Sequence, residues 1–407
     1  MAIKNVRNYS FDILYNIFYN DKLLNSEIND KFKTCDLSDE NKSYIKKECT
    51  GVIEKLDIID SIINKYSKVK TNKLKKDIIV VLRLGTYEIM YMDKVPNFAT
   101  VSECVNIIKS SKYSKLSGYV NAVLKNISKN ESYEETEKDN KRAYFRIYNN
   151  SEEKVIEELC DKSIKFSAYD GALQFKNSKI YYTDSYKDIL NLEAFKNGNL
   201  LIMDASSAFL SDALSCVISS NLNIESQLKF LDTCAAPGGK ILALYDILNK
   251  THADYIYEAR DISEYKINKI NENIDRLHVK NITTKVHDAT ILNVDDMENY
   301  DVVICDVPCS GLGVLDKKPD ISLRFNEDKL ESLVKLQLKI LEVSKQYVKS
   351  GGILSYSTCT ETKEENEENI KYFLKKNSNF RIIYEKQIIH GDENKSDGFY
   401  ICFLNKL

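Results

Sequence analysis

Residues 230–240 read FLDTCAAPGGK, an apolar run followed by a loop of small residues. Phe230 to Asp232 predict the end of a buried strand, and a helix is expected to begin near Gly239. Small residues let a ligand approach the backbone closely, and a helix N-terminus offers free N–H groups. The loop is not a Walker loop, because Cys234 stands where glycine is required and Ile241 follows Lys240. It also lacks the G-x-G-x-x-G pattern, so a pyrophosphate cofactor is disfavoured.

Short strand-like runs alternate with helix-like stretches from about residue 201 to the C-terminus. This alternation predicts βαβ units, and hence an α/β, Rossmann-like domain over residues 201–407 built on a parallel sheet. Ligands bind at the carboxyl ends of the strands in such sheets. The segment around Phe399 and Tyr400 is expected to add a late strand. The other expected strands are 228–232, 254–259, 283–286, 302–306 and 353–357.

The rest of the chain predicts two further parts. Residues 1–130 show apolar residues at helical spacing and predict an all-α domain, in which Thr100 and Glu103 resemble a capping box at a helix start. Residues 131–142, ESYEETEKDNKR, read as a charged linker. Residues 143–200 predict a small α+β subdomain, with strands expected at 144–147 and 179–182. The expectation is thus a multidomain protein.

Composition limits the class of protein. Of 407 residues, 43% are apolar and 29% charged, which excludes a wholly disordered chain. The first ten residues lack the apolar region of a secretory signal, and no apolar run approaches the ~18 residues of a membrane helix, so we expect a cytoplasmic protein with no membrane partner. The ten Cys form no C-x-x-C pair and the four His have no metal-ligand spacing, so reduced thiols and no metal are expected. The working expectation for the oligomeric state is a monomer.

Charge is distributed unevenly along the chain. Residues 1–130 carry 22 Lys and Arg against 15 Asp and Glu, a net charge of +7, while the remainder carries −10. A positive domain on a negative body indicates a polyanionic partner such as RNA or DNA. The alternative is that the charge reflects only lysine-rich surface helices, which are common.

Several reactive side chains stand where expected strands end. Asp261 lies 21 positions after Lys240, where nucleotide-binding folds place the acid that holds a ribose, and Asp288 ends the next strand similarly. Either could instead be a solvated loop acid or a helix cap. Asp306-Val-Pro-Cys309 and Ser355-Tyr-Ser-Thr-Cys359 each follow a strand. One such thiol is usually a core residue, but two thiols beside an aspartate are difficult to explain by packing.

The motifs FLDTCAAPGGK, DVPCSGLG and YSTCT resemble those of the RNA cytosine-C5 methyltransferase superfamily, and within it the bacterial 16S rRNA methyltransferase B family. That family has an N-terminal domain similar to the antitermination factor NusB, matched here by 82–85, 95–96 and 118–124. The chain departs from the family at Val307, where alanine is usual, and at Met203, where the family often has glutamine. Neither departure alters a reactive group.

The resemblance implies S-adenosylmethionine as the cofactor and 16S rRNA as the partner. It implies that Cys359 is the nucleophile, Cys309 the second thiol, and that Asp306 faces both the cofactor and the target base. Asp261 would hold the ribose hydroxyls, and Asp288 would lie by the adenine or the methionyl part. The loop that would line the cofactor comprises Cys234, Ala235, Ala236, Pro237, Gly238, Gly239 and Lys240.

The chemistry needs these residue types. Carbon 5 of cytosine is a poor nucleophile until a thiolate adds to carbon 6, after which it can attack the sulfonium methyl group and must then lose its proton. The reaction therefore needs a nucleophilic Cys, an acid near N3 and a base, and Cys359, Asp306 and Cys309 fit these roles in that order. Cys359 is favoured over Cys309 as nucleophile because the Thr-Cys thiol serves in the RNA family. The base is Cys309, or a water held by Cys309 or Asp306.

Three other functions were weighed. The same reaction on tRNA or 23S rRNA is the main rival, because the motifs specify the reaction rather than the substrate. A non-catalytic NusB-like RNA-binding factor is disfavoured, since no reactive residue is missing. A cysteine protease using Cys359 and His390 is the third.

Overall fold

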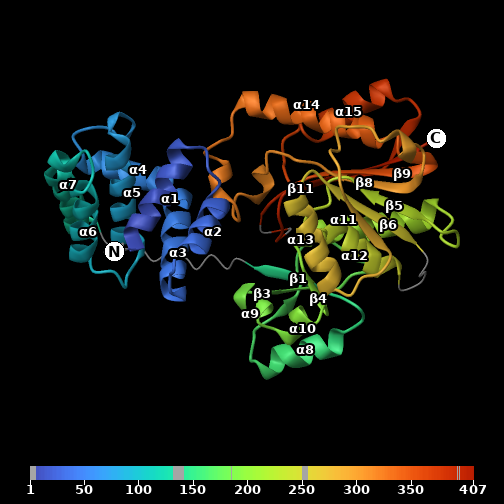
Figure 1. Cartoon of the computed structure of the whole chain (residues 1–407), viewed down its shortest axis with the longest axis horizontal. Helices are drawn as coiled ribbons and strands as arrows, with labels where there is room; N and C mark the ends of the chain where they lie inside the picture. The colour runs from blue at the N-terminus through green and yellow to red at the C-terminus, as the bar shows by residue number, and fades with distance from the viewer. Residues whose placement is uncertain (1–5, 132–141, 185, 250–254, 392, 394) are drawn as a thin grey trace. The chain divides into compact units, whose positions relative to one another are not determined.

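The computed structural model describes residues 6–131, 142–184, 186–249, 255–391, 393 and 395–407 (Figure 1). Contacts divide the chain into two compact units. Unit 1 comprises residues 1–139 together with 315–324, and unit 2 comprises 140–314 together with 325–407. The ten-residue segment 315–324 therefore belongs to the N-terminal unit, although it lies in the C-terminal half of the sequence.

Unit 1 is built from helices, as the apolar spacing predicts. Helix α5 (Lys76–Tyr91) is its centre, because thirteen of its sixteen residues are buried, and α1, α3, α4, α6 and α7 pack around it. The other helices are α1 (Val6–Tyr19), α2 (Leu24–Thr34), α3 (Asp39–Glu54), α4 (Leu56–Tyr66), η1 (Thr71–Lys73), α6 (Asn97–Lys109), η2 (Ser114–Leu116) and α7 (Ser117–Asn130).

The predicted capping box at Thr100 is wrong. Helix α6 begins at Asn97, directly after Pro96, so Thr100 lies inside the first turn and not at the cap. Its side chain is fully buried and its hydroxyl donates to Glu88, a buried carboxylate that also receives the Arg7 guanidinium at 2.7 Å. The buried acceptor, rather than the helix end, accounts for a threonine at this position.

Segment 315–324 supplies the N-terminal cap of helix α2 in unit 1. Helix α2 has no side-chain cap of its own at Leu23. Instead the carboxylate of Asp320, in η5 (Pro319–Ile321), accepts the free backbone N–H of Leu24 at 3.0 Å. Asp320 is 3% exposed. A residue 296 positions away in the chain thus acts as the N-cap, which no local sequence pattern signals.

Unit 2 contains two sheets. A four-stranded antiparallel sheet has the order β2-β3-β1-β4, and a seven-stranded sheet has the order β10-β11-β9-β8-β5-β6-β7. The small sheet and its helices comprise β1 (Ala143–Ile147), α8 (Glu152–Asp161), β2 (Ser167–Ala168), β3 (Ile180–Thr183), α9 (Tyr186–Leu190), α10 (Glu193–Lys196) and β4 (Leu200–Ile202). The remaining elements are α11 (Ala205–Asn221), β5 (Lys229–Asp232), α12 (Gly239–Leu248), β6 (Ile256–Asp261), α13 (Glu264–Arg276), β7 (Ile282–Val286), η3 (Val294–Asp296), β8 (Tyr300–Asp306), η4 (Leu312–Val314), α14 (Glu327–Ser344), β9 (Val348–Thr358), α15 (Glu367–Lys376), β10 (Phe380–Ile388) and β11 (Phe399–Lys406).

The large sheet is covered on both faces. Strands β7, β6, β5, β8 and β9 pair in parallel, and β11 runs antiparallel to β9 and β10. Successive residues alternate between two cores: Phe230 packs with α11, α12 and α13, and Leu231 packs with α14 and α15. Figure 1 shows these two helix layers on opposite sides of the sheet. The expected combination of an all-α domain, an α+β subdomain and an α/β domain is confirmed.

The small sheet is joined to the large domain by a shared core and a buried ion pair. Tyr144 and Tyr148 belong to the same apolar cluster as the helices under the large sheet. Arg146 on β1 pairs with Asp246 on α12 at 2.6 Å, and both side chains are almost fully buried. None of the described helices is long and apolar enough to cross a membrane.

Candidate active site

The predicted reactive residues lie along one edge of the large sheet. Strands β5, β6 and β8 end at Asp232, Asp261 and Asp306, and Cys359 directly follows β9. Because these strands run in parallel, their carboxyl ends meet at the same edge. The strand order therefore places the residues in the sequence Asp288, Asp261, Asp232, Asp306, Cys359 along this edge.

The glycine-rich loop connects β5 to helix α12. Gly238 has φ +98°, a left-handed conformation that favours glycine, and α12 begins at the next residue. A Cβ added at Gly239 would meet no atom within 4 Å, so open space lies beside the helix N-terminus. The loop is fixed to β6, because the Ala236 N–H donates to Asp261 at 2.9 Å and the Ala235 N–H donates to the Arg260 carbonyl at 2.9 Å. Burial, then the charges of Cys305 and Asp232, raises the pKa of the Cys234 thiol, which packs beside Leu231.

Three carboxylates and one ammonium meet beside this loop. Lys240 on α12 forms an ion pair with Asp306 at 2.6 Å, and Ser357 donates to the other Asp306 oxygen at 2.8 Å. Burial lowers the pKa of Lys240, but the charges of Asp306 and Asp232 outweigh that effect and the net pKa is raised. Asp232 is 1% exposed, and its Oδ2 has no hydrogen-bond partner among the described residues. Burial, then the charge of Asp306, raises the pKa of Asp232 to about 7.

This charge distribution fits a cationic ligand. Asp232, Asp261 and Asp306 bring three acids to the sheet edge. Lys240 pairs with Asp306 and Lys266 pairs with Asp261, so Asp232 is the acid that no ion pair offsets among the described residues. A buried carboxylate oxygen without a donor is costly until a donor or a cation arrives. The sulfonium and ammonium groups of S-adenosylmethionine are such cations, and the open space beside Gly239 leaves room for the ligand at the loop.

Asp261 and Asp288 are held in place differently. Asp261 is 3% exposed and is paired with Lys266 at 2.9 Å in addition to its bond from Ala236. Asp288 closes a tight turn, because the backbone N–H and the hydroxyl of Thr290 both donate to it at 2.8 Å. These two donors lower the pKa of Asp288.

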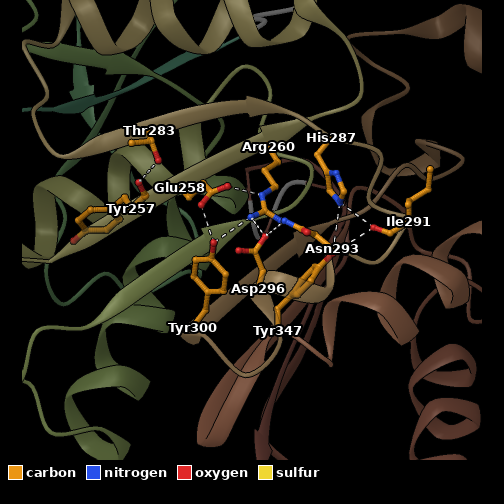
Figure 2. A network of polar contacts seen from close by, with 10 residues as sticks. All are labelled: Tyr257, Glu258, Arg260, Thr283, His287, Ile291, Asn293, Asp296, Tyr300 and Tyr347. Atoms are coloured by element: carbon orange, nitrogen blue, oxygen red, sulfur yellow. Dashed lines mark hydrogen bonds and ion pairs between the residues drawn. The ribbon is translucent and has the colours of Figure 1, made fainter.

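A buried arginine organises the loop that carries Asp288. Arg260, 1% exposed, contacts Glu258 at 2.6 Å, Asp296 at 2.6 Å and the Tyr300 hydroxyl at 3.1 Å (Figure 2). Asn293 also donates to Asp296, and its backbone N–H donates to Tyr347 at 2.9 Å. The network connects β6 and β8 to the loop after β7, so it fixes the segment that begins at His287, next to Asp261.

The two predicted thiols are in contact. The sulfur atoms of Cys309 and Cys359 lie 3.1 Å apart, and the Cys359 N–H donates to the Cys309 sulfur at 3.2 Å. The hydrogen bond with Cys359, then burial, raises the pKa of Cys309 well above its ordinary value. Two sulfur atoms at this distance oppose each other's ionisation, so a negative charge on one favours the thiol form of the other.

Two features were missed from the sequence. Asp232 ends a strand as Asp261 and Asp306 do, so the same criterion could have identified it as a site residue. Lys240 was expected only to line the cofactor loop, yet its ammonium group forms an ion pair with Asp306. Helical spacing could not reveal that contact, because it joins residues 66 positions apart.

Comparisons with known proteins agree with this geometry. Residues 219–404 match the sequence model of the 16S rRNA methyltransferase RsmB/F family, and residues 4–129 match that of the NusB family. The chain is 25% identical to the "Probable ribosomal RNA small subunit methyltransferase B" of Bacillus subtilis, covering 100% of both chains. It is 26% identical to the ribosomal RNA small subunit methyltransferase B of Proteus mirabilis, covering 91% of this chain and 92% of that one. The crystal structure of PH0851 superposes with a TM-score of 0.73 at 20% identity, covering 100% of both chains, and shares the fold.

The family match removes the cysteine-protease alternative and supports S-adenosylmethionine as the cofactor. Residues 219–404 therefore form a domain of the RsmB/F family and residues 4–129 a domain of the NusB family, and the protein is an S-adenosylmethionine-dependent rRNA methyltransferase of the RsmB/F type.

Proposed function

We propose that the protein methylates carbon 5 of a specific cytosine in 16S rRNA through a covalent bond between Cys359 and carbon 6 of the base. The observation that carries this proposal is the contact between the two thiols, beside the Lys240–Asp306 ion pair. The names of the relatives, which are small-subunit rRNA methyltransferases, support 16S rRNA as the target. A cytoplasmic location and a monomeric state belong to the same proposal and rest on the sequence.

The thiols have separate roles. Cys359 attacks carbon 6, because it stands in the Thr-Cys motif whose thiol is the nucleophile in the RNA family that the sequence resembles. Carbon 5 then has enamine character and takes the methyl group, which bound S-adenosylmethionine supplies on a sulfonium. Once Cys359 is bonded to carbon, its charge no longer raises the pKa of Cys309. Cys309 then gives its own proton to water, and its thiolate, or a water that Cys309 or Asp306 holds, removes the carbon-5 proton. Cys359 is eliminated as N3 gives back the proton that it took.

The Lys240–Asp306 pair stabilises the charge that develops on the target cytosine. Addition at carbon 6 pushes electrons onto N3, so a proton must be available there. The sequence assigned that proton to Asp306, but the nearest proton in the structure is on the Lys240 ammonium, 2.6 Å away. We assign the pair jointly: Asp306 orients the base, and Lys240 supplies or shares the proton.

The target base must be unpaired or flipped out of a helix, so a positive surface has to hold the flanking phosphates. Unit 1 offers a groove of about 570 Å³ between α6 and α7. Phe98, 78% exposed, lies at this groove and provides a surface for base stacking. Three exposed lysines also line it, and within the described part of the chain they form no ion pair: Lys109, Lys125 and Lys129.

The reaction is tested by methyl transfer from labelled S-adenosylmethionine to unmodified 16S rRNA, with 23S rRNA and tRNA in parallel. The expected result is 5-methylcytidine in 16S rRNA alone, and none with Cys359→Ala. Label in another RNA would overturn the 16S target and keep the chemistry. A Cys359→Ser protein with full activity would refute the assignment of the nucleophile.

The groove is tested separately by changing its three lysines to glutamate. Binding of 16S rRNA should weaken, and the slope of log K against log salt should fall by about 0.7 for each phosphate that the groove no longer neutralises. The matched control makes the same change in the loop between α4 and α5, at Lys68, Lys70 and Lys73. An equally weakened affinity in both triple variants would show general charge attraction instead of a binding groove.

A further inference from the structure

The residues on both sides of Cys309 are held by one buried carboxylate. Glu365, 0% exposed, accepts the backbone N–H of Ser310 at 2.8 Å and its hydroxyl at 2.5 Å. The same carboxylate accepts the Gln337 amide at 2.8 Å, and that amide also donates to the Pro308 carbonyl at 2.9 Å. Glu365 thus fixes the residue after Cys309 directly and the residue before it through Gln337.

The neighbouring side chain holds Cys359 in the same way. Asn366, 1% exposed, accepts the Thr358 hydroxyl at 2.5 Å and donates to the Thr360 carbonyl at 3.0 Å. It therefore holds the residues before and after Cys359. A hydrogen bond joins the two loops directly, because the hydroxyls of Ser310 and Thr360 lie 2.8 Å apart.

The sheet alone cannot do this. The ladder between β8 and β9 ends with Asp306 opposite Ser357. Both thiols lie beyond this point, in loops that leave different strands. Beyond the bond from Val307 to Ser357, one more backbone bond joins the two loops, from the Gly313 N–H to the Cys359 carbonyl at 3.1 Å. The Gly313 bond holds Cys359 but lies four residues after Cys309, so the contact of the two sulfur atoms at 3.1 Å also depends on the side chains that hold their neighbours.

We propose that Glu365 and Asn366 are positioning residues for the methyl transfer: the dipeptide holds the loops of Cys309 and Cys359 in register, so that the two sulfur atoms stay in contact. The inference rests on the proposed function for the roles of the thiols. It assigns the dipeptide no contact with base or cofactor.

The substitution Glu365→Ala should lower kcat about 100-fold, since a displacement of about 1 Å at reacting groups has an effect of that size. The KM for S-adenosylmethionine should stay unchanged, because the cofactor loop, Asp261 and Asp288 lie at the ends of β5, β6 and β7, and Asp306 is held by Lys240 and Ser357 rather than by Glu365. Glu365→Gln should recover much of the rate. Its remaining oxygen can accept the N–H donors of Ser310 and Gln337, while the Ser310 and Thr362 hydroxyls turn to accept from its amide.

A second measurement reports on the sulfur atoms without any methyl transfer. A diazene dicarboxamide oxidant takes two electrons and two protons from a pair of thiols, and peptide mapping then quantifies the Cys309–Cys359 disulfide. Wild type should form it roughly tenfold faster than Glu365→Ala, because its sulfurs are already in contact. The matched control is Glu364→Ala, one residue away and exposed, which should behave as wild type in both assays.

Wild-type kcat or a wild-type rate of disulfide formation in Glu365→Ala would overturn the proposal. If that variant does not fold, Asn366→Ala carries the same two measurements with the same expected direction. Absence of 5-methylcytidine with wild-type protein would instead refute the proposed function, and the disulfide assay would still test whether the dipeptide holds the thiols.

Discussion

Replacing Asp232 with asparagine should make the unliganded protein more stable at pH 8 and weaken its hold on the cofactor. The carboxylate is buried at the end of β5, and one of its oxygens accepts the Cys234 N–H at 3.2 Å. The other oxygen has no partner among the described residues. The protein therefore leaves the negative charge of the Asp232 carboxylate largely unstabilised. A bound cation would stabilise that charge.

The magnitude follows from the pKa of Asp232, which burial and the charge of Asp306 raise from 3.8 to about 7. The pKa of Asp232 is higher in the folded state than in the unfolded state. The protonated carboxyl therefore makes its full contribution to the free energy of unfolding below about pH 4, and this contribution is lost as the pH rises towards 7. A shift of this size corresponds to about 4 kcal/mol above pH 7. Asparagine cannot ionise, but its amide hydrogens lack an acceptor, which costs about 2 kcal/mol. The net expectation is a gain of roughly 2 kcal/mol at pH 8 and a loss at pH 4.

The assay is urea unfolding of wild type and Asp232→Asn without cofactor, between pH 4 and pH 8. Titration calorimetry with S-adenosylmethionine should show an affinity about ten- to a hundredfold weaker for the variant, the usual worth of a hydrogen bond to a charged group. Asp295→Asn, at an exposed acid in η3, is the control and should change neither quantity. The reasoning would be refuted if Asp232→Asn changed the free energy of unfolding, relative to wild type, by the same amount at pH 4 and at pH 8. An unchanged affinity for the cofactor would also refute it.

Three further predictions concern other parts of the molecule. Arg260→Met should raise the KM for S-adenosylmethionine about tenfold with little change in kcat, because the loop carrying Asp288 loses its anchor; steady-state kinetics would show it, and a fall in kcat alone would contradict it. Asp320→Ala should lower the stability of unit 1 by about 1 kcal/mol and speed amide exchange at Leu24, whereas unchanged exchange would mean that the cap is not formed in solution. Gly313→Ala should lower kcat more than it lowers stability, since a Cβ there would lie 2.2 Å from the Gly398 carbonyl oxygen and would push on the loop of Cys309; activity and thermal unfolding measured together would test this.

Most of the fold could be predicted because it follows from local patterns. The strands ending at Asp232, Asp261 and Asp306 were placed from apolar runs bounded by loop residues, and each appears in the structure with its end where expected or within two residues. The error at Thr100 has a physical origin: a capping pattern depends on residue types, but the buried acceptor on Glu88 comes from another helix. Composition and spacing contain no information about such a partner.

The chain order alone was enough to predict that the reactive side chains lie together, because parallel strands bring their carboxyl ends, and the Asp and Cys residues there, to one edge whatever the details of packing. Three properties depend on contacts between distant segments and therefore required the folded molecule. The ion pair of Lys240 with Asp306 and the unsatisfied carboxylate of Asp232 arise from burial among charges that the sequence does not place together. The contact of the two thiols, and the dipeptide that holds their loops, arises because side chains rather than the sheet ladder set geometry beyond the strand ends.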